Sequence, residues 1–251
     1  AFGAWDAQSE DSSMIIGRNF DFYVGDEFAE DKIVAFVEPE EGYPFMMVTW
    51  AGMIGVVSGM NTEGLTITLN AAKSSIPGGA KTPVSILARE ILQYTSTIDE
   101  AYAMAERTET FVAEMFLIGS ARDGKAVVIE KTPKETHLYD PGTDHITVTN
   151  HFQSEALKNT ELNIENIENE TSAYRLKRTD ELLDIHAPLN TNAAVSILRN
   201  RLGVSDHDIG LGNEIAINQF IAHHGIVFKP ETREVRVSTH PYQLGSFAYY
   251  N

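Results

Sequence analysis

Short apolar segments dominate the first third of the chain, and each is rich in β-branched or aromatic residues and bounded by Gly, Pro or Asn. Such segments are typical of β-strands. Strands are therefore predicted at residues 13–16, 32–37, 45–50, 54–57 and 65–69. We expect these successive strands to form a layered antiparallel sheet.

The apolar residues change to a helical spacing after residue 82. They recur at positions 84, 87, 88, 91 and 92, behind Thr82 as the predicted N-cap and Pro83 at the first helical position. A second helix is predicted to follow Thr97, because Glu100 comes three residues later and the pair has the form of a capping box. Two consecutive helices therefore follow the first group of strands.

The strand pattern then returns and is followed by a second pair of helices. Strands are predicted at residues 115–118, 126–130, 136–139 and 146–149, helices at 172–184 and 192–200, the latter capped by Thr191, and strands at 221–228, 234–238 and 246–250. Strands and helices in separate runs indicate an α+β architecture, with helices layered on antiparallel sheet. No Pro- or Ser-rich linker interrupts the pattern, so residues 1–251 are predicted to form a single domain.

Composition narrows the function classes. The 251 residues are 43% hydrophobic, which is enough for a core, and the net charge of −17 disfavours nucleic acid and anionic membranes as partners. No apolar run reaches the roughly 18 to 20 residues of a membrane-spanning helix, and no leader-like segment precedes Ala1, so a soluble, mature chain is expected and its compartment is left open. The absence of cysteine excludes disulfides, thiolate-bound zinc and a cysteine nucleophile within this chain.

Candidate site residues lie at strand ends and at one helix start. Arg18 and Asp21 follow an apolar strand, where a surface ion pair is the simpler interpretation. Asn70 and Asn150 each close an apolar strand, which suggests side-chain amides held at one edge of a sheet. Arg175 lies near a helix start, where the macrodipole opposes a cation, so an anionic partner or a solvated side chain would explain it.

Other polar residues have simpler interpretations. Asn61 is predicted to be a turn residue that tolerates a left-handed conformation. His223 and His224 lie in an apolar run, and adjacent strand residues point to opposite faces, so we expect core or supporting histidines that do not share a metal. No metal-binding or cofactor motif occurs, and no Gly-x-Ser-x-Gly elbow, so neither a metal nor a cofactor is predicted.

Several motifs, each weak alone, occur in one order and spacing. They are Phe2-Gly3-Ala4-Trp5, Gly17-Arg18-Asn19-Phe20-Asp21, Gly59-Met60-Asn61-Thr62-Glu63-Gly64-Leu65, Leu69-Asn70, Thr149-Asn150-His151-Phe152, Tyr174-Arg175 and the run from Ala222 to Phe228. Together they resemble the N-terminal nucleophile (Ntn) hydrolases of the choloylglycine hydrolase and penicillin acylase group, and most closely its acyl-CoA:6-aminopenicillanic acid acyltransferase-like branch. The resemblance implies a four-layer αββα sandwich of two antiparallel sheets flanked by helices, and activation by autocatalytic cleavage that exposes an N-terminal Cys.

The resemblance also implies roles for the candidate residues. The N-terminal residue of such enzymes supplies both the nucleophile and, through its α-amine, the base. Arg18 would lie against the nucleophile, and Asp21 would accept a hydrogen bond from the α-amine. Asn70 and Asn150 would donate to the oxyanion. Arg175 would complete the polar network.

The nucleophilic Cys of that group is absent here, and two explanations compete. The 17 steps from Ala1 to Arg18 match the bile-acid hydrolase branch, which would make Ala1 a replacement for Cys. The local match of Phe2-Gly3-Ala4-Trp5 favours the second explanation, in which one or two leading residues are missing. Either way, the sequence predicts that this molecule is inactive as given.

The leading hypothesis is an amide hydrolase or acyltransferase that acts on the C–N amide or thioester bond of a small acyl compound. One alternative is a catalytically inert binding module on the same fold, and another is a bile-salt hydrolase. The expected partner is a small-molecule substrate, and a homo-oligomer is left open. The five polar site residues favour an enzyme, because a binding module does not need a network built around an amine and an oxyanion.

Overall fold

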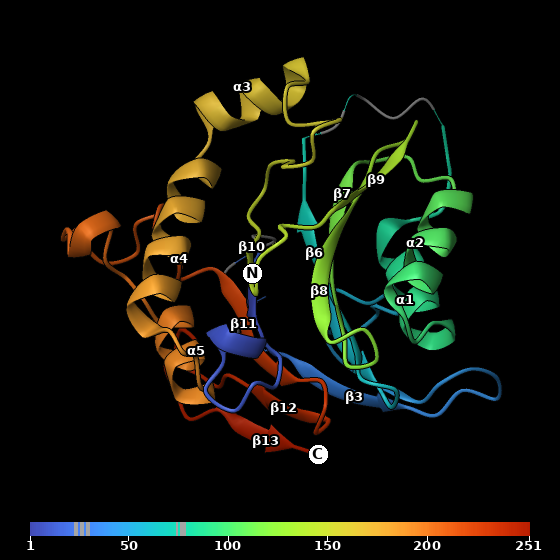
Figure 1. The fold of residues 1–251 in the computed structure, drawn as a ribbon, viewed down its shortest axis with the longest axis horizontal. Helices are drawn as coiled ribbons and strands as arrows, with labels where there is room; N and C mark the ends of the chain where they lie inside the picture. The colour runs from blue at the N-terminus through green and yellow to red at the C-terminus, as the bar shows by residue number, and fades with distance from the viewer. Residues whose placement is uncertain (23–24, 26–27, 29–30, 74, 76–78) are drawn as a thin grey trace.

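The computed structural model describes residues 1–22, 25, 28, 31–73, 75 and 79–251. Its strands form two antiparallel sheets that face each other (Figure 1). In spatial order, the six-stranded sheet comprises β10 (His145–Thr147), β1 (Phe2–Ala4), β2 (Ile15–Asp21), β11 (Ala222–Lys229), β12 (Glu234–Val237) and β13 (Ala248–Tyr250). The seven-stranded sheet comprises β3 (Ile33–Val37), β4 (Phe45–Thr49), β5 (Ser58–Asn61), β6 (Leu65–Ala71), β7 (Glu114–Ser120), β8 (Lys125–Lys131) and β9 (Thr136–Tyr139).

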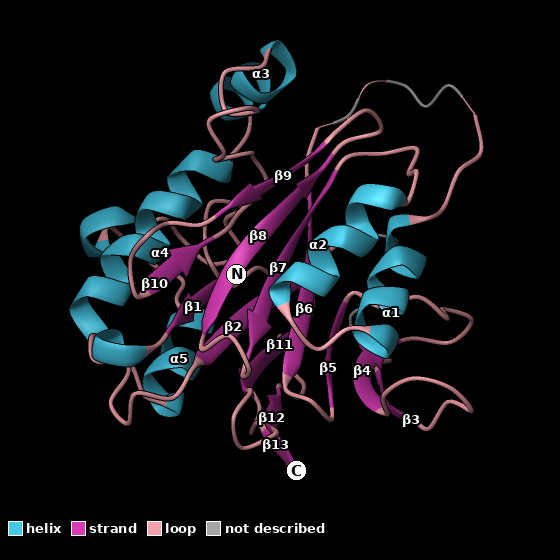
Figure 2. Cartoon of the chain, turned by 45° about the vertical axis from the view of Figure 1, so that its right-hand side comes forward, coloured by secondary structure: helices cyan, strands magenta, loops and turns pink. Residues whose placement is uncertain are grey.

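Helices cover the outer face of each sheet, as Figure 2 shows. Helices α1 (Val84–Tyr94) and α2 (Ile98–Arg107) pack on the seven-stranded sheet through one apolar cluster. Helices α4 (Ser172–His186) and α5 (Thr191–Leu198) cover the six-stranded sheet through another. A third cluster fills the space between the sheets. The predicted four-layer αββα sandwich is therefore confirmed, with α3 (Glu161–Asn169) preceding α4 at one end.

The pleat of β6 explains how a polar residue reaches the interior. Successive strand residues point to opposite faces, and Leu65, Ile67 and Leu69 pack into the cluster beneath α1 and α2. The intervening positions 66, 68 and 70 therefore face the other sheet, and Asn70 is the last of them. The amide of Asn70 consequently enters the space between the two sheets at the end of the strand.

Some local predictions were wrong. Residues 54–57 form a loop, and the strand is β5 (Ser58–Asn61), because regular pairing with β6 begins at Ser58 and pairing with β4 at Gly59. Pro83, not Thr82, is the N-cap of α1, and the side chain of Asn190, not Thr191, caps α5. The short strand β1 and helix α3 were not predicted.

Asn61 closes the β5–β6 turn through its side-chain hydrogen bonds, not through the predicted left-handed backbone conformation. Its side-chain oxygen accepts hydrogen bonds from the backbone N–H groups of Glu63 and Leu65, each at 3.0 Å, and its amide donates to Leu92 and Thr95 in and beyond α1. The left-handed conformation of this turn belongs to Gly64, whose φ is +77°. Asn61 therefore ties the β5–β6 turn to the helix layer.

Thr97 caps α2 as predicted, with its hydroxyl oxygen accepting from the N–H of Glu100. The Glu100 carboxylate accepts from the N–H of Ser96 at 2.7 Å, one residue before the N-cap.

No helix within the described part of the chain is long and apolar enough to span a membrane.

Candidate active site

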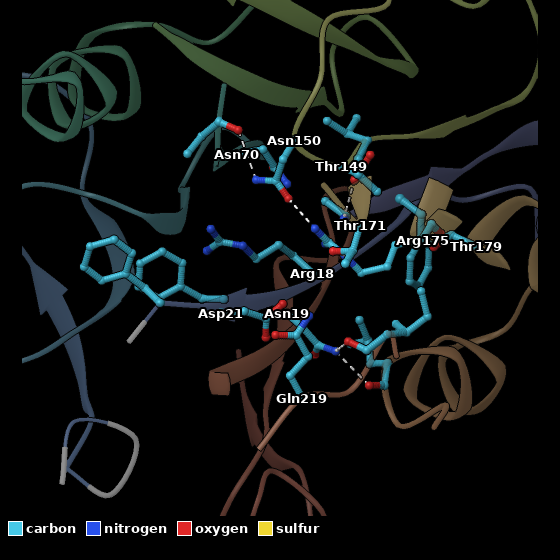
Figure 3. A pocket seen from close by; sticks show the side chains of 18 of the residues that line it. Arg18, Asn19, Asp21, Asn70, Thr149, Asn150, Thr171, Arg175, Thr179 and Gln219 are labelled. Atoms are coloured by element: carbon cyan, nitrogen blue, oxygen red, sulfur yellow. Dashed lines mark hydrogen bonds between the residues drawn. The ribbon is translucent and has the colours of Figure 1, made fainter. Parts of the chain in front are cut away.

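A cavity of about 250 Å³ lies at the N-terminal end of β1, where the two sheets meet α4 (Figure 3). Its walls come from β2, the end of β6, the segment after β10, the first turns of α4 and residues 214–221. All six predicted positions line it: Ala1, Arg18, Asp21, Asn70, Asn150 and Arg175. Segments far apart in the sequence thus contribute side chains to one cavity.

Ala1 extends β1 into the wall of this cavity. Its α-amino group donates to the carbonyl of Val148 at 2.8 Å, and the N–H of Val148 donates back to the Ala1 carbonyl at 2.8 Å. Burial, with smaller contributions from Arg18 and Arg175, lowers the pKa of the α-amino group to about 4, although Asp21 opposes the shift. The α-amine is therefore held in its neutral, basic form at neutral pH.

Arg18 is almost completely buried, at 2% exposure. Its Nη1 donates to the carbonyl of Val57 at 3.0 Å and to the hydroxyl of Ser58, and its Nη2 donates to the carbonyl of Leu69. The guanidinium also lies 4.4 Å from the ring centroid of Phe20, a cation–π distance. Burial lowers its pKa to about 9, and its Nε has no hydrogen-bond partner within the described chain.

Asp21 does not form the surface ion pair that was the simpler interpretation. Arg18 donates instead to Val57, Ser58 and Leu69, and Oδ1 of Asp21 is buried without a hydrogen-bond partner among the described residues. Burial raises the pKa of the carboxyl, and Arg175, Arg18 and the α-amine of Ala1 oppose that shift. Asp21 therefore acts on the N-terminus through its charge, and the direct hydrogen bond that the resemblance implied is not formed.

Asn150 is held firmly from several sides. Its amide donates to the carbonyl of Ala71 at 3.0 Å, and its side-chain oxygen accepts from Arg175 at 2.8 Å. The Asn150 N–H donates to the hydroxyl of Ser172 at 2.8 Å, and its carbonyl accepts from the amide of Asn166. The contact with Ala71 joins the end of β6 to the segment after β10, so the two predicted asparagines converge, as Figure 3 shows.

Asn70 presents a different environment in the same wall. It is 9% exposed, and its Oδ1 is buried without a partner among the described residues. A buried amide oxygen without a protein partner is costly, so such an atom is usually satisfied by a ligand or by water. Asn70 is therefore an adaptable donor and acceptor beside the fixed Asn150.

Arg175 lies in the first turn of α4, and its position now has a reason. Besides Asn150, it bonds Thr171 through Nε at 3.2 Å, and Asp21 is the leading negative charge acting on it. Burial lowers the pKa of the guanidinium. The charge of Asp21 and the hydrogen bonds to Asn150 and Thr171 offset the unfavourable interaction of this cation with the helix macrodipole.

Two further polar residues had no predicted role: Asn19, which lines the cavity, and Glu114, whose charge acts on Arg18. Asn19 donates through its amide to the carbonyls of Leu198 at 2.8 Å and Ile217 at 2.9 Å, which anchors β2 to the opposite wall. Glu114 is buried without a partner for its Oε1 within the described chain, and burial raises its pKa to about 8. A carboxylate beside an apolar strand was the only signal available for it.

The prediction for His223 and His224 was wrong in geometry. A register irregularity between β2 and β11 lies at His223, so the two imidazoles do not alternate across the strand. Their Nδ1 atoms lie 2.8 Å apart, and both residues are fully buried. No group of three or more His, Cys, Asp or Glu side chains able to hold a metal occurs among the residues that the structure describes.

Comparison with known proteins places the sequence in one family. Residues 7–209 match the model of the acyl-coenzyme A:6-aminopenicillanic acid acyl-transferase family. The chain belongs to this family. One curated relative, an uncharacterized protein of Archaeoglobus fulgidus, is 26% identical over 126 residues, which are 49% of this chain and 20% of that protein. The match thus spans about a fifth of the relative's length.

Solved structures of Ntn hydrolases share the fold of this family member. An N-acylethanolamine-hydrolyzing acid amidase ortholog of Caenorhabditis elegans is 18% identical, with a TM-score of 0.62 and 92% of each chain covered. A cysteine-to-alanine mutant of conjugated bile acid hydrolase from Clostridium perfringens is 14% identical, with a TM-score of 0.58 over 100% of this chain and 97% of that one. Penicillin V acylase from Agrobacterium tumefaciens is 12% identical, with a TM-score of 0.59 over 95% and 83%. At these identities the likeness concerns the fold.

Proposed function

We propose that the cavity at Ala1 is the active site of an Ntn-type amide hydrolase or acyltransferase that acts on small acyl compounds. The observation that carries this proposal is the convergence of a buried α-amine with two arginines, an aspartate and two asparagine amides. These are the groups that a nucleophile, a base and an oxyanion need in one place.

The placement of Ala1 supports the explanation in which it stands where the family's nucleophilic cysteine would be. The nitrogen of Ala1 lies in the wall of the cavity that Arg18 and Asp21 also line, and it donates to the carbonyl of Val148. The methyl side chain of alanine cannot attack a carbonyl carbon. Cysteine at position 1 would place a thiol on the same Cβ, beside the neutral amine.

The chemistry would run in two steps in a form with cysteine at position 1. The α-amine takes the proton of the thiol, and the thiolate attacks the acyl carbonyl carbon to form a tetrahedral oxyanion. Collapse of this species breaks the C–N bond, and the leaving amine departs with the proton from the α-ammonium group. Water or an acceptor amine then attacks the thioester, releases the acyl product and returns the thiol.

The asparagines would stabilise the oxyanion. Asn150 uses one amide hydrogen on the Ala71 carbonyl, which leaves the second for a substrate oxygen. Its side-chain oxygen is fixed by Arg175, so the amide cannot rotate freely. A preorganised donor of this kind typically contributes about 10²-fold or more in rate.

An inert binding module is the second candidate, and alanine at position 1 is the observation that favours it. Such a module would bind an acyl compound in the cavity without forming a covalent intermediate. The two candidates therefore differ in what cysteine at position 1 would do.

Replacement of Ala1 by cysteine tests the proposal. The Ala1→Cys variant, with a free α-amine verified by intact mass, is incubated with N-acylethanolamines, penicillin V and a conjugated bile acid, which represent the three structural neighbours. We expect release of the amine and a transient mass increase equal to one acyl group. The matched control is Ala4→Cys, which places a thiol in the core of the same strand, outside the cavity lining.

Acylation of Ala1→Cys but not of Ala4→Cys supports the enzyme. Binding of a substrate by the unchanged chain, with no turnover by a correctly folded Ala1→Cys variant, would overturn the proposal in favour of the binding module. Equal acylation of both variants would also count against it, because it would reflect thiol reactivity alone.

A further inference from the structure

A buried chain of polar side chains leads away from the cavity behind Arg18. Nη1 of Arg18 donates to the hydroxyl of Ser58, Ser58 Oγ lies 2.8 Å from Nε2 of His224, and Nδ1 of His224 lies 2.8 Å from Nδ1 of His223. Arg18 is 2% exposed, and the other three residues are fully buried. Ser58 belongs to the opposite sheet, so this chain also joins the two sheets.

The direction of each hydrogen bond follows from the chemistry of the groups. A guanidinium can only donate, so the hydroxyl oxygen of Ser58 accepts from Arg18. The Ser58 hydroxyl then donates its own hydrogen to Nε2 of His224. His224 must then carry its proton on Nδ1 and donate it to Nδ1 of His223. The proton of His223 consequently lies on Nε2, which has no hydrogen bond of ordinary geometry in the described chain, although the backbone of Asp31 acts on this ring as an acceptor.

This order requires both imidazoles to be neutral. Burial lowers the pKa of His223 to about 4 and that of His224 well below its usual value. Lys32 and Arg18 lower the pKa of both rings as well, and His240 lowers that of His223, whereas the backbone of Asp31 opposes these effects on His223. A proton on Nε2 of His224 would remove the acceptor of Ser58 and place a second cation next to Arg18.

Aromatic rings enclose the histidine pair and exclude competing partners. Phe28 stacks on His223 with 4.7 Å between ring centroids, and Trp50 meets the same ring edge-on at 5.4 Å. Phe20, the ring beneath the Arg18 guanidinium, lies 5.5 Å from His224. Arg18 is therefore the end of the hydrogen-bond chain that reaches the cavity.

We propose that Ser58 and His224 are positioning residues that orient the Arg18 guanidinium toward the ligand in the cavity. The role of Arg18 toward a ligand rests on the proposed function, whereas the geometry of the hydrogen-bond chain is independent of it. The Ser58 and Val57 bonds use both hydrogens of Nη1, and Leu69 uses one of Nη2. The Nε–H and the second Nη2–H remain for a ligand.

The main competing explanation is packing alone, and the chain provides a matched control for it. Thr68 lies directly opposite Ser58 in the β5–β6 ladder and is also fully buried. Its hydroxyl has no hydrogen-bond partner among the described residues. Thr68→Val and Ser58→Ala therefore each remove one buried hydroxyl from the same place, but only the second breaks the chain to Arg18.

The first experiment uses the unchanged protein and needs no activity. Nitrogen-15 NMR of the imidazoles should show His224 as the Nδ1–H tautomer and His223 as the Nε2–H tautomer, both neutral at pH 7. Arg18 should show separate, slowly exchanging Nη resonances. A charged His224, or the opposite tautomer on it, would overturn the proposal.

The second experiment compares variants by the same signals. Ser58→Ala should merge or broaden the Nη resonances of Arg18, whereas Thr68→Val should leave them in place. His224→Gln keeps an acceptor near the position of Nε2 and should preserve the Arg18 signals better than His224→Leu. Equal loss in all four variants would indicate packing alone and would overturn the positioning role.

The third experiment measures catalysis in the Ala1→Cys background. Ser58→Ala should lower kcat about tenfold with little change in KM, because a bond to a charged group is lost. Thr68→Val should stay within about twofold, since it breaks no hydrogen bond. If Ala1→Cys itself is inactive, the proposed function fails, while the NMR results still decide the positioning of Arg18. If Ala1→Cys is active, but Ser58→Ala and Thr68→Val have the same kcat and the same Arg18 resonances, only the positioning role is overturned and the proposed function stands.

Discussion

Arg18 and Arg178 are both buried arginines, but their surroundings differ. Arg178, on α4, is 0% exposed and makes ion pairs with Glu181 at 2.7 Å and with Asp206. Burial alone would lower the pKa of Arg178, but the hydrogen bonds that it donates to the two carboxylates raise the pKa above its usual value. Arg18 instead contacts backbone carbonyls and a hydroxyl, and its pKa is lowered to about 9.

This difference separates a structural cation from one available to a ligand. The charge of Arg178 is used within the fold, where its ion pair with Asp206 joins α4 to the segment around that residue. Arg18 and Arg175 are oriented by neutral acceptors, and the nearby carboxylate of Asp21 acts on both from a distance. A buried cation without a contacting carboxylate is unfavourable for stability, which is a cost expected at functional sites.

The largest expected effect comes from exchanging each arginine for methionine. Arg178→Met should lower the free energy of unfolding by about 3 kcal/mol, because two carboxylates lose their partner. Arg18→Met should cost less stability but lower kcat of the Ala1→Cys enzyme by about 10²-fold or more. Urea unfolding and steady-state kinetics on the same samples check this. Equal stability losses, or a catalytic loss for Arg178→Met per folded molecule, would remove the distinction between the two arginines.

The two asparagines provide the next comparison. Asn70→Ala and Asn150→Ala should each lower kcat by roughly 10²-fold, for one lost oxyanion donor. Asn150→Ala should also cost about 1–2 kcal/mol of stability, because it breaks the bonds to Ala71 and Arg175. Asn70→Ala should be nearly neutral in unfolding experiments. Unchanged rates for both variants would leave the fold assignment intact and refute the oxyanion role.

A smaller effect on stability is expected for Asp21→Asn. The substitution removes the negative charge that raises the pKa of the Ala1 α-amine, so this pKa should fall further below its present value of about 4. We expect a lower kcat in the Ala1→Cys enzyme and little change in the thermal midpoint. The pH dependence of α-amine modification reports the first effect. A large stability loss with normal activity per folded molecule would instead mean that Asp21 is structural.

Glu114, the other carboxyl group that acts on Arg18, should affect only the pH dependence of stability. Its pKa is raised from about 4.5 to about 8, so the folded protein holds a proton that the unfolded chain releases between these values. Its contribution to stability is therefore complete below about pH 4.5 and is lost as the pH rises through about 8. Glu114→Gln should match the unchanged protein at pH 4.5 and exceed it at pH 9 by on the order of 1 kcal/mol or more. A parallel pH profile for both proteins would contradict a raised pKa.

Much of the architecture follows from local patterns in the sequence. The alternation in residues 65–69 indicates a strand with one apolar face, and Thr97 with Glu100 marks the start of α2. The motifs that resemble the family single out five polar residues that all line one cavity. These patterns are readable because backbone periodicity and capping depend on residues a few positions apart.

Only the tertiary structure decides which of these residues meet. Asn70 and Asn150 are brought together because the end of β6 packs beside the segment after β10, through a bond to the carbonyl of Ala71. The contact of His223 with His224 depends on an irregular register between β11 and β2, and the role of Ser58 depends on the facing sheet. Alternation within a strand predicts which face a side chain takes, but its partner comes from another sheet. Sequence determined the strands that carry the polar groups, and sheet packing determined that the chain's first residue lies among them.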